Sequence, residues 1–181
     1  MTRQISTDHP VQPAKFAHFV LRVSDLAASV KWYETVLGMK TVFGNEMIVF
    51  MTYDDEHHRL ALAKTPVAAG PRGAPGLDHV AYTLNSLADL LSTYKRLKSV
   101  GIETVWPINH GMTTSLYYAD PDGNRVEFQI ENFATKAELQ DYFRSESFAK
   151  NPIGVQFDPA RLLARYEWGD DIHALLQQDV S

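Results

Sequence analysis

The sequence predicts an α+β fold made of two tandem βαβββ modules followed by a C-terminal helical extension. The first observation behind this prediction is an internal repeat, because residues 16–42 and 77–105 show the same residue pattern. The second is that each copy changes from strand-type alternation to helical spacing and then to three more strand-like runs. At an offset of 61 residues, like residues align: His18 with His79, Leu26 with Leu87, and Tyr33 with Tyr94.

Each copy opens with apolar residues at alternate positions, which is typical of a half-buried strand. Polar pairs then begin a segment with helical spacing that ends at a glycine: Ser24-Asp25 in the first copy and Asn85-Ser86 in the second. Three strand-like runs complete each copy: MKTVFG, EMIVFMTY and RLALAK in the first, and IETVWPI, SLYYAD and RVEFQI in the second. The stretch TPVAAGPRGAPG between the copies has the composition of a linker.

These patterns divide the chain into four parts: an N-terminal arm at 1–14, a first module at 15–70, a second module at 71–132 and a helical extension at 133–181. In the extension, Thr135 and Glu138 have the spacing of a helix capping box. Asp158 and Pro159 have the order of an N-cap and a first-turn proline. We expect this extension to pack across the modules.

The composition narrows the class of function. The absence of cysteine excludes disulfides, thiolate metal sites and a cysteine nucleophile. No apolar run approaches membrane-spanning length and no signal-peptide core is present, so we expect a soluble, cytoplasmic protein. The net charge is -5 with scattered Lys and Arg, which argues against binding of nucleic acid or a membrane surface. We therefore expect a small-molecule ligand, and a homo-oligomer.

Three residues form a candidate metal site. A lone strand histidine is usually a buried core residue, but His18 and His79 hold equivalent places in the two copies. A pseudo-twofold pairing of the modules would therefore bring both imidazoles to one cavity. Glu127 lies in an apolar strand, where an unpaired buried carboxylate costs several kcal/mol, on the order of a lost ion pair. A divalent cation removes that cost, and two histidines with one carboxylate form the facial triad of non-haem Fe(II) oxygenases.

The repeat also supplies an internal control for the metal site. Aligning the last strands places RVEFQ (125–129) over RLALA (59–63), so the counterpart of Glu127 is Ala61. A methyl group cannot bind a metal, and the sequence therefore predicts no fourth protein ligand. An open metal face suits a substrate that chelates the metal beside a bound gas.

Residues 108–127, INHGMTTSLYYADPDGNRVE, resemble the signature of the type I extradiol ring-cleavage dioxygenases of the vicinal oxygen chelate superfamily. The resemblance covers about residues 15–132, and the segment 153–166 is similar to tails of related single-domain proteins. It implies a vicinal oxygen chelate fold with a metal-holding β cup, and cleavage of a catechol-type diol by O2 in the extradiol position, as in aromatic hydrocarbon catabolism. It also implies Fe(II), with Mn(II) as an alternative, bound by His18, His79 and Glu127.

The resemblance further implies three catalytic residues. Tyr117 matches the family's tyrosine ten residues before the glutamate, and His110 matches its substrate-contacting histidine. His58 in HHRLAL stands where the family has its acid-base histidine, although its spacing to His79 is longer. From the residues alone, His57 and His58 could belong to a solvated turn, and His110 and Tyr117 could be ordinary turn and strand residues.

Two alternatives stay open. The same fold could belong to a metal-dependent isomerase or lyase of the glyoxalase type, against which Ala61 counts. It could instead be a non-enzymatic cup that binds a small molecule, as in bleomycin-resistance proteins, but such a cup needs no ligand triad. Apolar residues that could line a pocket suggest an apolar aromatic substrate, although any of them could belong to the core instead: Trp106, Met112, Phe128 and Phe148.

Overall fold

The structure is a computed structural model that describes residues 12–67 and 75–178. It divides into two compact units, Met1–Val67 and Ala68–Ser181, each of which is described by itself. Most of the predicted N-terminal arm and part of the predicted linker lie outside the described residues. The four-part division of the chain stays a prediction.

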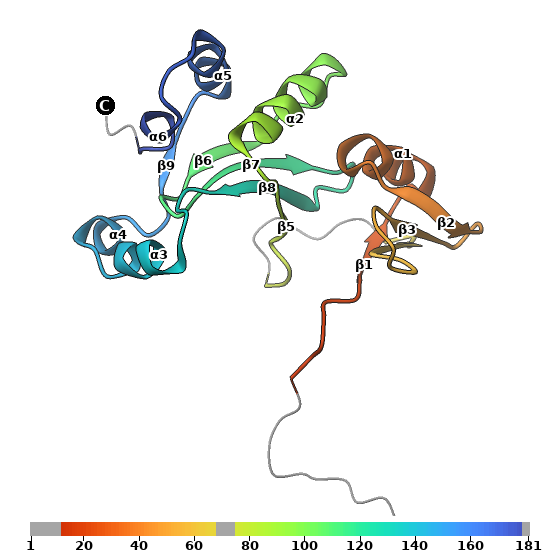
Figure 1. Ribbon diagram of the computed structural model, residues 1–181. Coiled ribbons are helices and arrows are strands. Elements are labelled where there is room, and N and C mark those ends of the chain that lie inside the picture. The colour runs from red at the N-terminus through yellow and green to blue at the C-terminus, as the bar shows by residue number, and fades with distance from the viewer. Residues whose placement is uncertain (1–11, 68–74, 179–181) are drawn as a thin grey trace, which may run out of the picture. The chain divides into compact units, whose positions relative to one another are not determined.

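The first unit has the predicted βαβββ order (Figure 1). Its sheet has the strand order β1-β4-β3-β2, in which β1 pairs with β4 in parallel and the other pairs are antiparallel. The elements are β1 (Phe19–Val23), α1 (Leu26–Leu37), β2 (Lys40–Gly44), β3 (Ile48–Thr52) and β4 (Leu60–Lys64).

Helix α1 begins and ends at the residues that the sequence indicated. The Asp25 side chain accepts the Ala28 N–H at 3.0 Å, and Gly38 ends the helix in the left-handed region with φ 64°. The helix packs on β3 and β4 through the buried residues Tyr33 and Val36. Ser29 is buried on the same face, and the charged residues Lys31 and Glu34 are not, so the helix covers the sheet with one face as its spacing predicts.

The second unit repeats the βαβββ order and adds a strand from the extension. Its strand order is β5-β8-β7-β6-β9, again with one parallel pair, β5 with β8, next to antiparallel ones. The repeated elements are β5 (His79–Thr83), α2 (Leu87–Ser99), β6 (Trp106–Asn109), β7 (Thr113–Ala119) and β8 (Arg125–Glu131). The vicinal-oxygen-chelate type of α+β fold is confirmed.

Strand alternation in β8 separates a core face from a polar face. Helix α2 begins at Ser86, whose hydroxyl accepts the Asp89 N–H, and packs on β8 through buried leucines. Phe128 packs against Tyr82 and Tyr118 on the core face. Successive side chains of a strand point to opposite faces, so Glu127 lies on the other face. Phe128 is therefore a core residue, which is one of the two alternatives that the sequence left open for it.

The extension holds α3 (Lys136–Phe143), α4 (Glu146–Lys150), β9 (Val155–Gln156), α5 (Pro159–Trp168) and α6 (Ile172–Leu175). The capping box of Thr135 and Glu138 is confirmed, as is the Asp158 N-cap before Pro159. The sequence indicated only helices here, whereas β9 pairs with the edge strand β6. Figure 1 shows β9 at the sheet edge between the α3–α4 and α5–α6 pairs.

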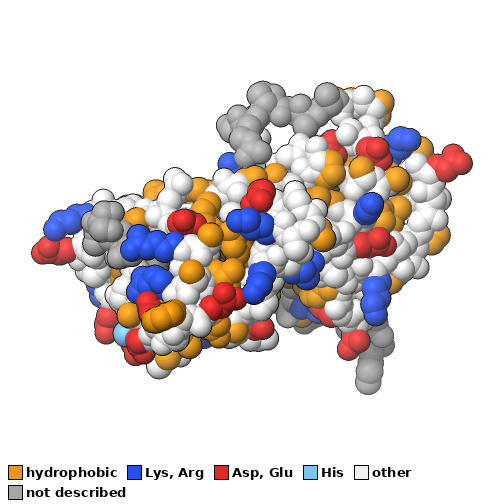
Figure 2. All heavy atoms as spheres, turned by 90° about the horizontal axis from the view of Figure 1, so that it is seen from above, with side chains coloured by type: hydrophobic (Ala, Val, Ile, Leu, Met, Phe, Trp, Pro, Cys, Tyr) orange, Lys and Arg blue, Asp and Glu red, His pale blue; other side chains and the backbone are white. Residues whose placement is uncertain are grey.

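The face of the molecule drawn in Figure 2 carries no dominant charge. Figure 2 shows acidic and basic side chains mixed over the visible face. Among the residues that the structure describes, no helix is long and apolar enough to cross a membrane.

Candidate functional site

The second unit brings two of the predicted metal ligands together. His79 opens β5, and Glu127 lies in β8, the strand that pairs with β5. The His79 Nε2 atom is 3.1 Å from Glu127 Oε2. Glu127 is only 4% exposed, so its carboxylate is removed from water and needs a partner.

Asp78 determines what His79 presents to Glu127. The other ring nitrogen, Nδ1, lies 2.8 Å from Asp78 Oδ2. A neutral imidazole carries one N–H and cannot donate to carboxylates on both sides. If Nδ1–H is given to Asp78, the bare Nε2 and the Glu127 oxygen face each other with lone pairs, and a cation between them relieves the repulsion. Two ligand atoms about 2.1 Å from a divalent ion and at right angles are about 3 Å apart, so this pair fits a metal.

Tyr117 and His110 lie beside Glu127. Tyr117 in β7 is the cross-strand partner of Glu127, and His110 follows β6 in the turn to β7. The His110 Nε2 atom is 3.2 Å from the Tyr117 hydroxyl and 3.9 Å from Glu127 Oε1. Burial, and next the Glu127 carboxylate, raise the pKa of Tyr117, so its phenol keeps its proton. The predicted residues His79, His110, Tyr117 and Glu127 thus form one cluster.

Backbone turns position this cluster. Asp120 is buried, and its Oδ1 accepts the N–H groups of Asp122 and Asn124 at 3.0 and 2.8 Å. Gly123 adopts φ 87°, which favours glycine. The segment between β7 and β8 is therefore a structural turn that leads the chain back into the Glu127 strand.

The first unit gathers the other predicted residues. His18 directly precedes β1, and its ring centroid is 4.2 Å from that of His58. Phe50 also stacks on His58, with ring centroids 4.6 Å apart and an interplanar angle of 13°. Burial, followed by the neighbouring imidazoles of His18 and His57, lowers the pKa of His58. His57, in contrast, has a largely exposed side chain.

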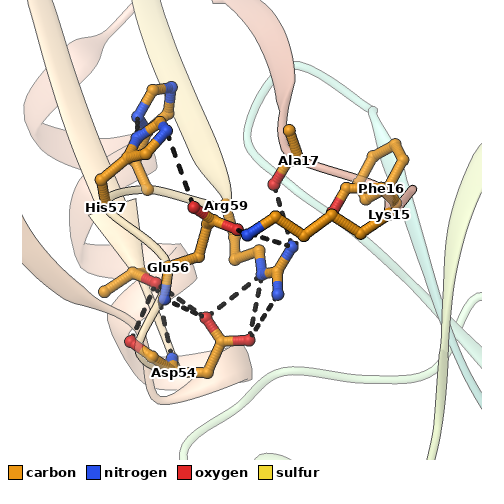
Figure 3. Close-up of polar contacts among 9 residues, drawn as sticks. Lys15, Phe16, Ala17, Asp54, Glu56, His57 and Arg59 are labelled. Atoms are coloured by element: carbon orange, nitrogen blue, oxygen red, sulfur yellow. Dashed lines mark hydrogen bonds and ion pairs between the residues drawn. The ribbon is translucent and has the colours of Figure 1, made fainter. Parts of the chain in front are cut away.

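Arg59 fixes the segment that leads into His18 (Figure 3). Its Nη1 donates to the carbonyl oxygens of Phe16 and Ala17, at 2.5 and 3.1 Å. Its Nε and Nη2 donate to the Asp54 carboxylate at 3.0 and 2.9 Å. One guanidinium therefore ties the approach to β1 to the loop that carries His57 and His58.

The strand registers confirm that Ala61 is the counterpart of Glu127. Ala61 pairs with Val20 and Phe50, whereas Glu127 pairs with Ala81 and Tyr117. The offset of 61 residues between the copies aligns Val20 with Ala81. The first unit therefore has a methyl group where the second has a carboxylate.

The three predicted ligands belong to different units, His18 to the first and His79 and Glu127 to the second. Within the described residues of either unit, no three His, Asp or Glu side chains form a group that could hold a metal. The complete triad stays a prediction, as do the roles of His58, His110 and Tyr117.

Sequence reasoning missed several residues that support the site. Arg59 and Arg125 occupy equivalent positions in the aligned last strands, a signal that was available but not used. Arg125 Nη1 lies 3.6 Å from Asp78 Oδ2, next to His79. Among the predicted pocket residues, Trp106 packs on Tyr117 at 4.9 Å, but Phe148 packs within the extension against Tyr142 and Phe143.

The paired βαβββ units and the His–Glu cluster define a glyoxalase-type protein. The chain belongs to the Glyoxalase/Bleomycin resistance protein/Dioxygenase superfamily, whose model matches residues 15–128. A solved structure of a glyoxylase/bleomycin resistance protein/dioxygenase domain from Frankia sp. EAN1pec matches with a TM-score of 0.59 at 20% identity, over 71% of this chain and 99% of that one. At that identity, the likeness shows the fold alone.

Two curated relatives are much more similar in sequence. Biphenyl-2,3-diol 1,2-dioxygenase 2 of Rhodococcus globerulus is 52% identical over 147 residues, which cover 80% of this chain and 77% of the relative. Biphenyl-2,3-diol 1,2-dioxygenase 3 of the same organism is 46% identical over 158 residues, which cover 86% of this chain and 83% of the relative. The alignments therefore extend well beyond a shared motif.

Proposed function

We propose that this protein is an extradiol dioxygenase that opens the ring of an aromatic diol with O2. The observation that carries the proposal is the cluster of His79, Glu127, Tyr117 and His110 in one unit. Relatives named as biphenyl-2,3-diol 1,2-dioxygenases, at 46% and 52% identity, support the same reaction class. Ala61 disfavours the isomerase alternative, because it adds no fourth metal ligand.

The proposed cofactor is Fe(II), with Mn(II) as the alternative, held by His18, His79 and Glu127. Two imidazoles and a carboxylate are the donor set of non-haem Fe(II) oxygenases. When bound, the metal supplies neighbouring open positions for the diol and O2 and allows electrons to pass between them. The Asp78 contact supports this assignment, because it leaves the Nε2 lone pair of His79 directed at Glu127.

Protein side chains manage the protons. The lowered pKa of His58 keeps its ring neutral near pH 7, so it can accept a proton from the diol and return it later in the cycle. The raised pKa of Tyr117 keeps its phenol protonated, so it can donate a hydrogen bond to a substrate oxygen. His110 lies beside this phenol, with its Nε2 3.2 Å from the Tyr117 hydroxyl.

The aromatic surroundings suit an apolar aromatic substrate. Trp106 packs on Tyr117 in the second unit, and Phe50 stacks on His58 in the first. Flat aromatic side chains around a few polar groups are typical of small-molecule sites. We therefore include a diol with an apolar ring substituent, of the biphenyl-2,3-diol kind, in the proposed substrate class. A homo-oligomer also remains part of the proposal and is measurable by light scattering.

Regiochemistry tests the reaction. The purified protein is loaded anaerobically with Fe(II), its metal content is verified, and a panel of catechols including biphenyl-2,3-diol is added with ¹⁸O2. We expect a yellow ring-opened product that contains both oxygen atoms, with activity lost on oxidation to Fe(III) and regained on anaerobic reduction. A colourless muconate, cleaved between the hydroxyls, would refute the mechanism. No oxygen consumption with any diol would favour the isomerase or binding-cup function.

A further inference from the structure

The C-terminal extension is built against His110 and the residue before it. Strand β9 pairs with β6, with Asn109 opposite Val155. Asn109 is 5% exposed, and its side chain donates to the Leu176 carbonyl at 2.9 Å. The Gln178 side chain donates to the Asn109 carbonyl, also at 2.9 Å. The middle of the extension and its C-terminal end therefore both hold the end of β6, which leads into the site.

One contact from the extension acts on the imidazole itself. His110 Nδ1 donates to the backbone carbonyl of Ile153. A carbonyl oxygen only accepts hydrogen bonds, so this contact requires the ring proton on Nδ1. The neutral ring then has a bare Nε2, and that is the atom 3.2 Å from the Tyr117 hydroxyl.

The Ile153 carbonyl is held by a packed loop. The Asn151 side chain accepts the Gly154 N–H at 3.0 Å and donates to the Gly154 carbonyl at 2.8 Å. A Cβ at Gly154 would collide with the backbone of Asn109 and would lie 2.7 Å from the Cα of His110. Glycine is therefore needed for the loop to approach His110 this closely.

A second residue of the extension holds the other side of the same turn. The Tyr142 hydroxyl in α3 donates to the His110 carbonyl at 3.3 Å. It lies so close to Gly111 that a Cβ there would overlap it. Backbone and ring of His110 are thus fixed from two separate elements of the extension.

We propose that the extension is a positioning element of the site: the Ile153 carbonyl selects the Nδ1–H tautomer of His110, so that Nε2 meets the substrate as a hydrogen-bond acceptor. This inference rests on the proposed function for its chemical meaning. His110 in this tautomer accepts a hydrogen bond at Nε2 from a diol hydroxyl or from Tyr117, while its Nδ1–H stays on the Ile153 carbonyl.

Two glycine variants in the extension test the proposal. Gly154 and Gly169 both have positive φ, at 113° and 95°, so alanine strains the backbone at either position. A Cβ at Gly169 meets no atom within 4 Å, whereas one at Gly154 meets the His110 turn. Gly169→Ala is therefore the matched control for Gly154→Ala.

The first readout is the protonation of the two His110 ring nitrogens. It is measured by ¹⁵N NMR on the full-length protein with diamagnetic Zn(II) added, and assigned with His110→Gln. Wild type and Gly169→Ala should show a protonated Nδ1 and a bare Nε2. Gly154→Ala should show a shift toward Nε2–H or an average of tautomers. A wild-type ring protonated on Nε2 alone, or an unchanged pattern in Gly154→Ala, would overturn the proposal.

The second readout is turnover of the Fe(II)-loaded enzyme. Gly154→Ala should lower kcat about 10-fold or more, because a shifted His110 no longer aligns with the reacting group, while metal content stays unchanged. If Gly154→Ala fails to fold, Asn151→Ala loosens the same loop. Loss of the Nδ1–H pattern in that variant supports the proposal, and a wild-type pattern contradicts it. Because the NMR readout needs no turnover, an inactive wild type with Nδ1–H would contradict only the proposed function.

Discussion

The two units share a backbone plan but differ in what their strands present. In the second unit, Tyr117 and Glu127 face each other across β7 and β8. In the first, the equivalent pair across β3 and β4 is Phe50 and Ala61. At each of these two positions, the second unit has a polar side chain where the first has an apolar one. At these paired positions, the second unit therefore carries a phenol and a carboxylate, whereas the first carries a phenyl ring and a methyl group.

The support of the two histidines is partly common to both units. Arg59 donates to the carbonyl of Ala17, the residue before His18. Arg125 lies 3.6 Å from the carboxylate of Asp78, the residue before His79. An arginine at the same strand position thus contacts the residue before each histidine. In the second unit that residue, Asp78, also contacts the histidine ring through its carboxylate, whereas its counterpart Ala17 has no carboxylate.

The largest effect is expected from making the two units alike at the carboxylate position. Glu127→Ala copies Ala61 and removes a predicted ligand, so purified protein should retain almost no metal and no activity. Ala61→Glu is the reverse change and supplies a fourth donor, which should keep the metal but suppress turnover by closing an open position. Metal analysis after gel filtration measures metal retention in the two variants, and oxygen uptake measures their turnover. Full metal content in Glu127→Ala would remove Glu127 from the ligand set.

Loss of the proposed acid-base residue should rank second. His58→Phe keeps an aromatic ring on Phe50 but removes the proton acceptor, and should slow turnover about 100-fold or more with metal content intact. His57→Phe is the comparison variant, measured on the pH plateau: the His57 Nδ1 lies 2.6 Å from that of His58, so its loss should change the pH dependence more than the maximal rate. Equal losses in the two variants, or full activity in His58→Phe, would transfer the role to another group.

The pH profile sharpens the same prediction. Only neutral His58 accepts a proton, and its lowered pKa lets the neutral form persist to more acidic solution than an ordinary histidine. The acid limb of kcat/KM should therefore lie below pH 6.5, the ordinary histidine pKa. Since the neighbouring His57 contributes to the lowering, His57→Phe should move this limb to higher pH. A limb that stays in place in both His57→Phe and His58→Phe would belong to a different group.

Most of the fold was readable from the sequence, because its signals are local. Alternation, helical spacing and capping residues such as Asp25 and Thr135 each act within a few positions of the chain. Strand β9 was missed because two residues cannot show a period. Phe128 was left open between pocket and core, although the two-residue period of a strand already places it opposite to Glu127.

The site was only partly readable for a different reason. Histidine, tyrosine and glutamate are residue types that bind metals or transfer protons, so their places in the duplicated pattern were enough to propose them as site residues. The partner of His110, in contrast, is the backbone carbonyl of Ile153, which is 43 positions away and which any residue could supply. In the sequence, Gly154 is the one residue near Ile153 whose type is compatible with a close approach of this loop to the His110 backbone. Asp78 stood next to His79 in the sequence, but its contact depends on a side-chain rotamer that the sequence does not specify.

The third prediction removes the ring partner that only the second unit has. Asp78→Ala copies Ala17 and leaves His79 Nδ1 without its carboxylate acceptor. Metal affinity should fall by about 10- to 100-fold, the usual effect of removing a partner that orients a metal-bound histidine. Asp78→Asn is the control, because its carbonyl can still accept the Nδ1–H and should restore most of the affinity. Equal losses in Asp78→Ala and Asp78→Asn would assign the effect to charge instead of orientation.

The smallest effects are expected from the two equivalent arginines, and they should be unequal. Arg59 bonds two carbonyls and a carboxylate through one planar guanidinium, and a lysine cannot make these bonds together. Arg59→Lys should therefore loosen the segment before His18 and weaken metal binding about 10-fold, the low end for such supporting contacts. Arg125→Lys loses a longer contact to an Asp78 side chain that is 68% exposed, and should cost less than about 5-fold. Metal titrations of both variants by competition with a chelating dye measure the difference. A larger loss in Arg125→Lys than in Arg59→Lys would mean that the second histidine, and not the first, depends more on its arginine.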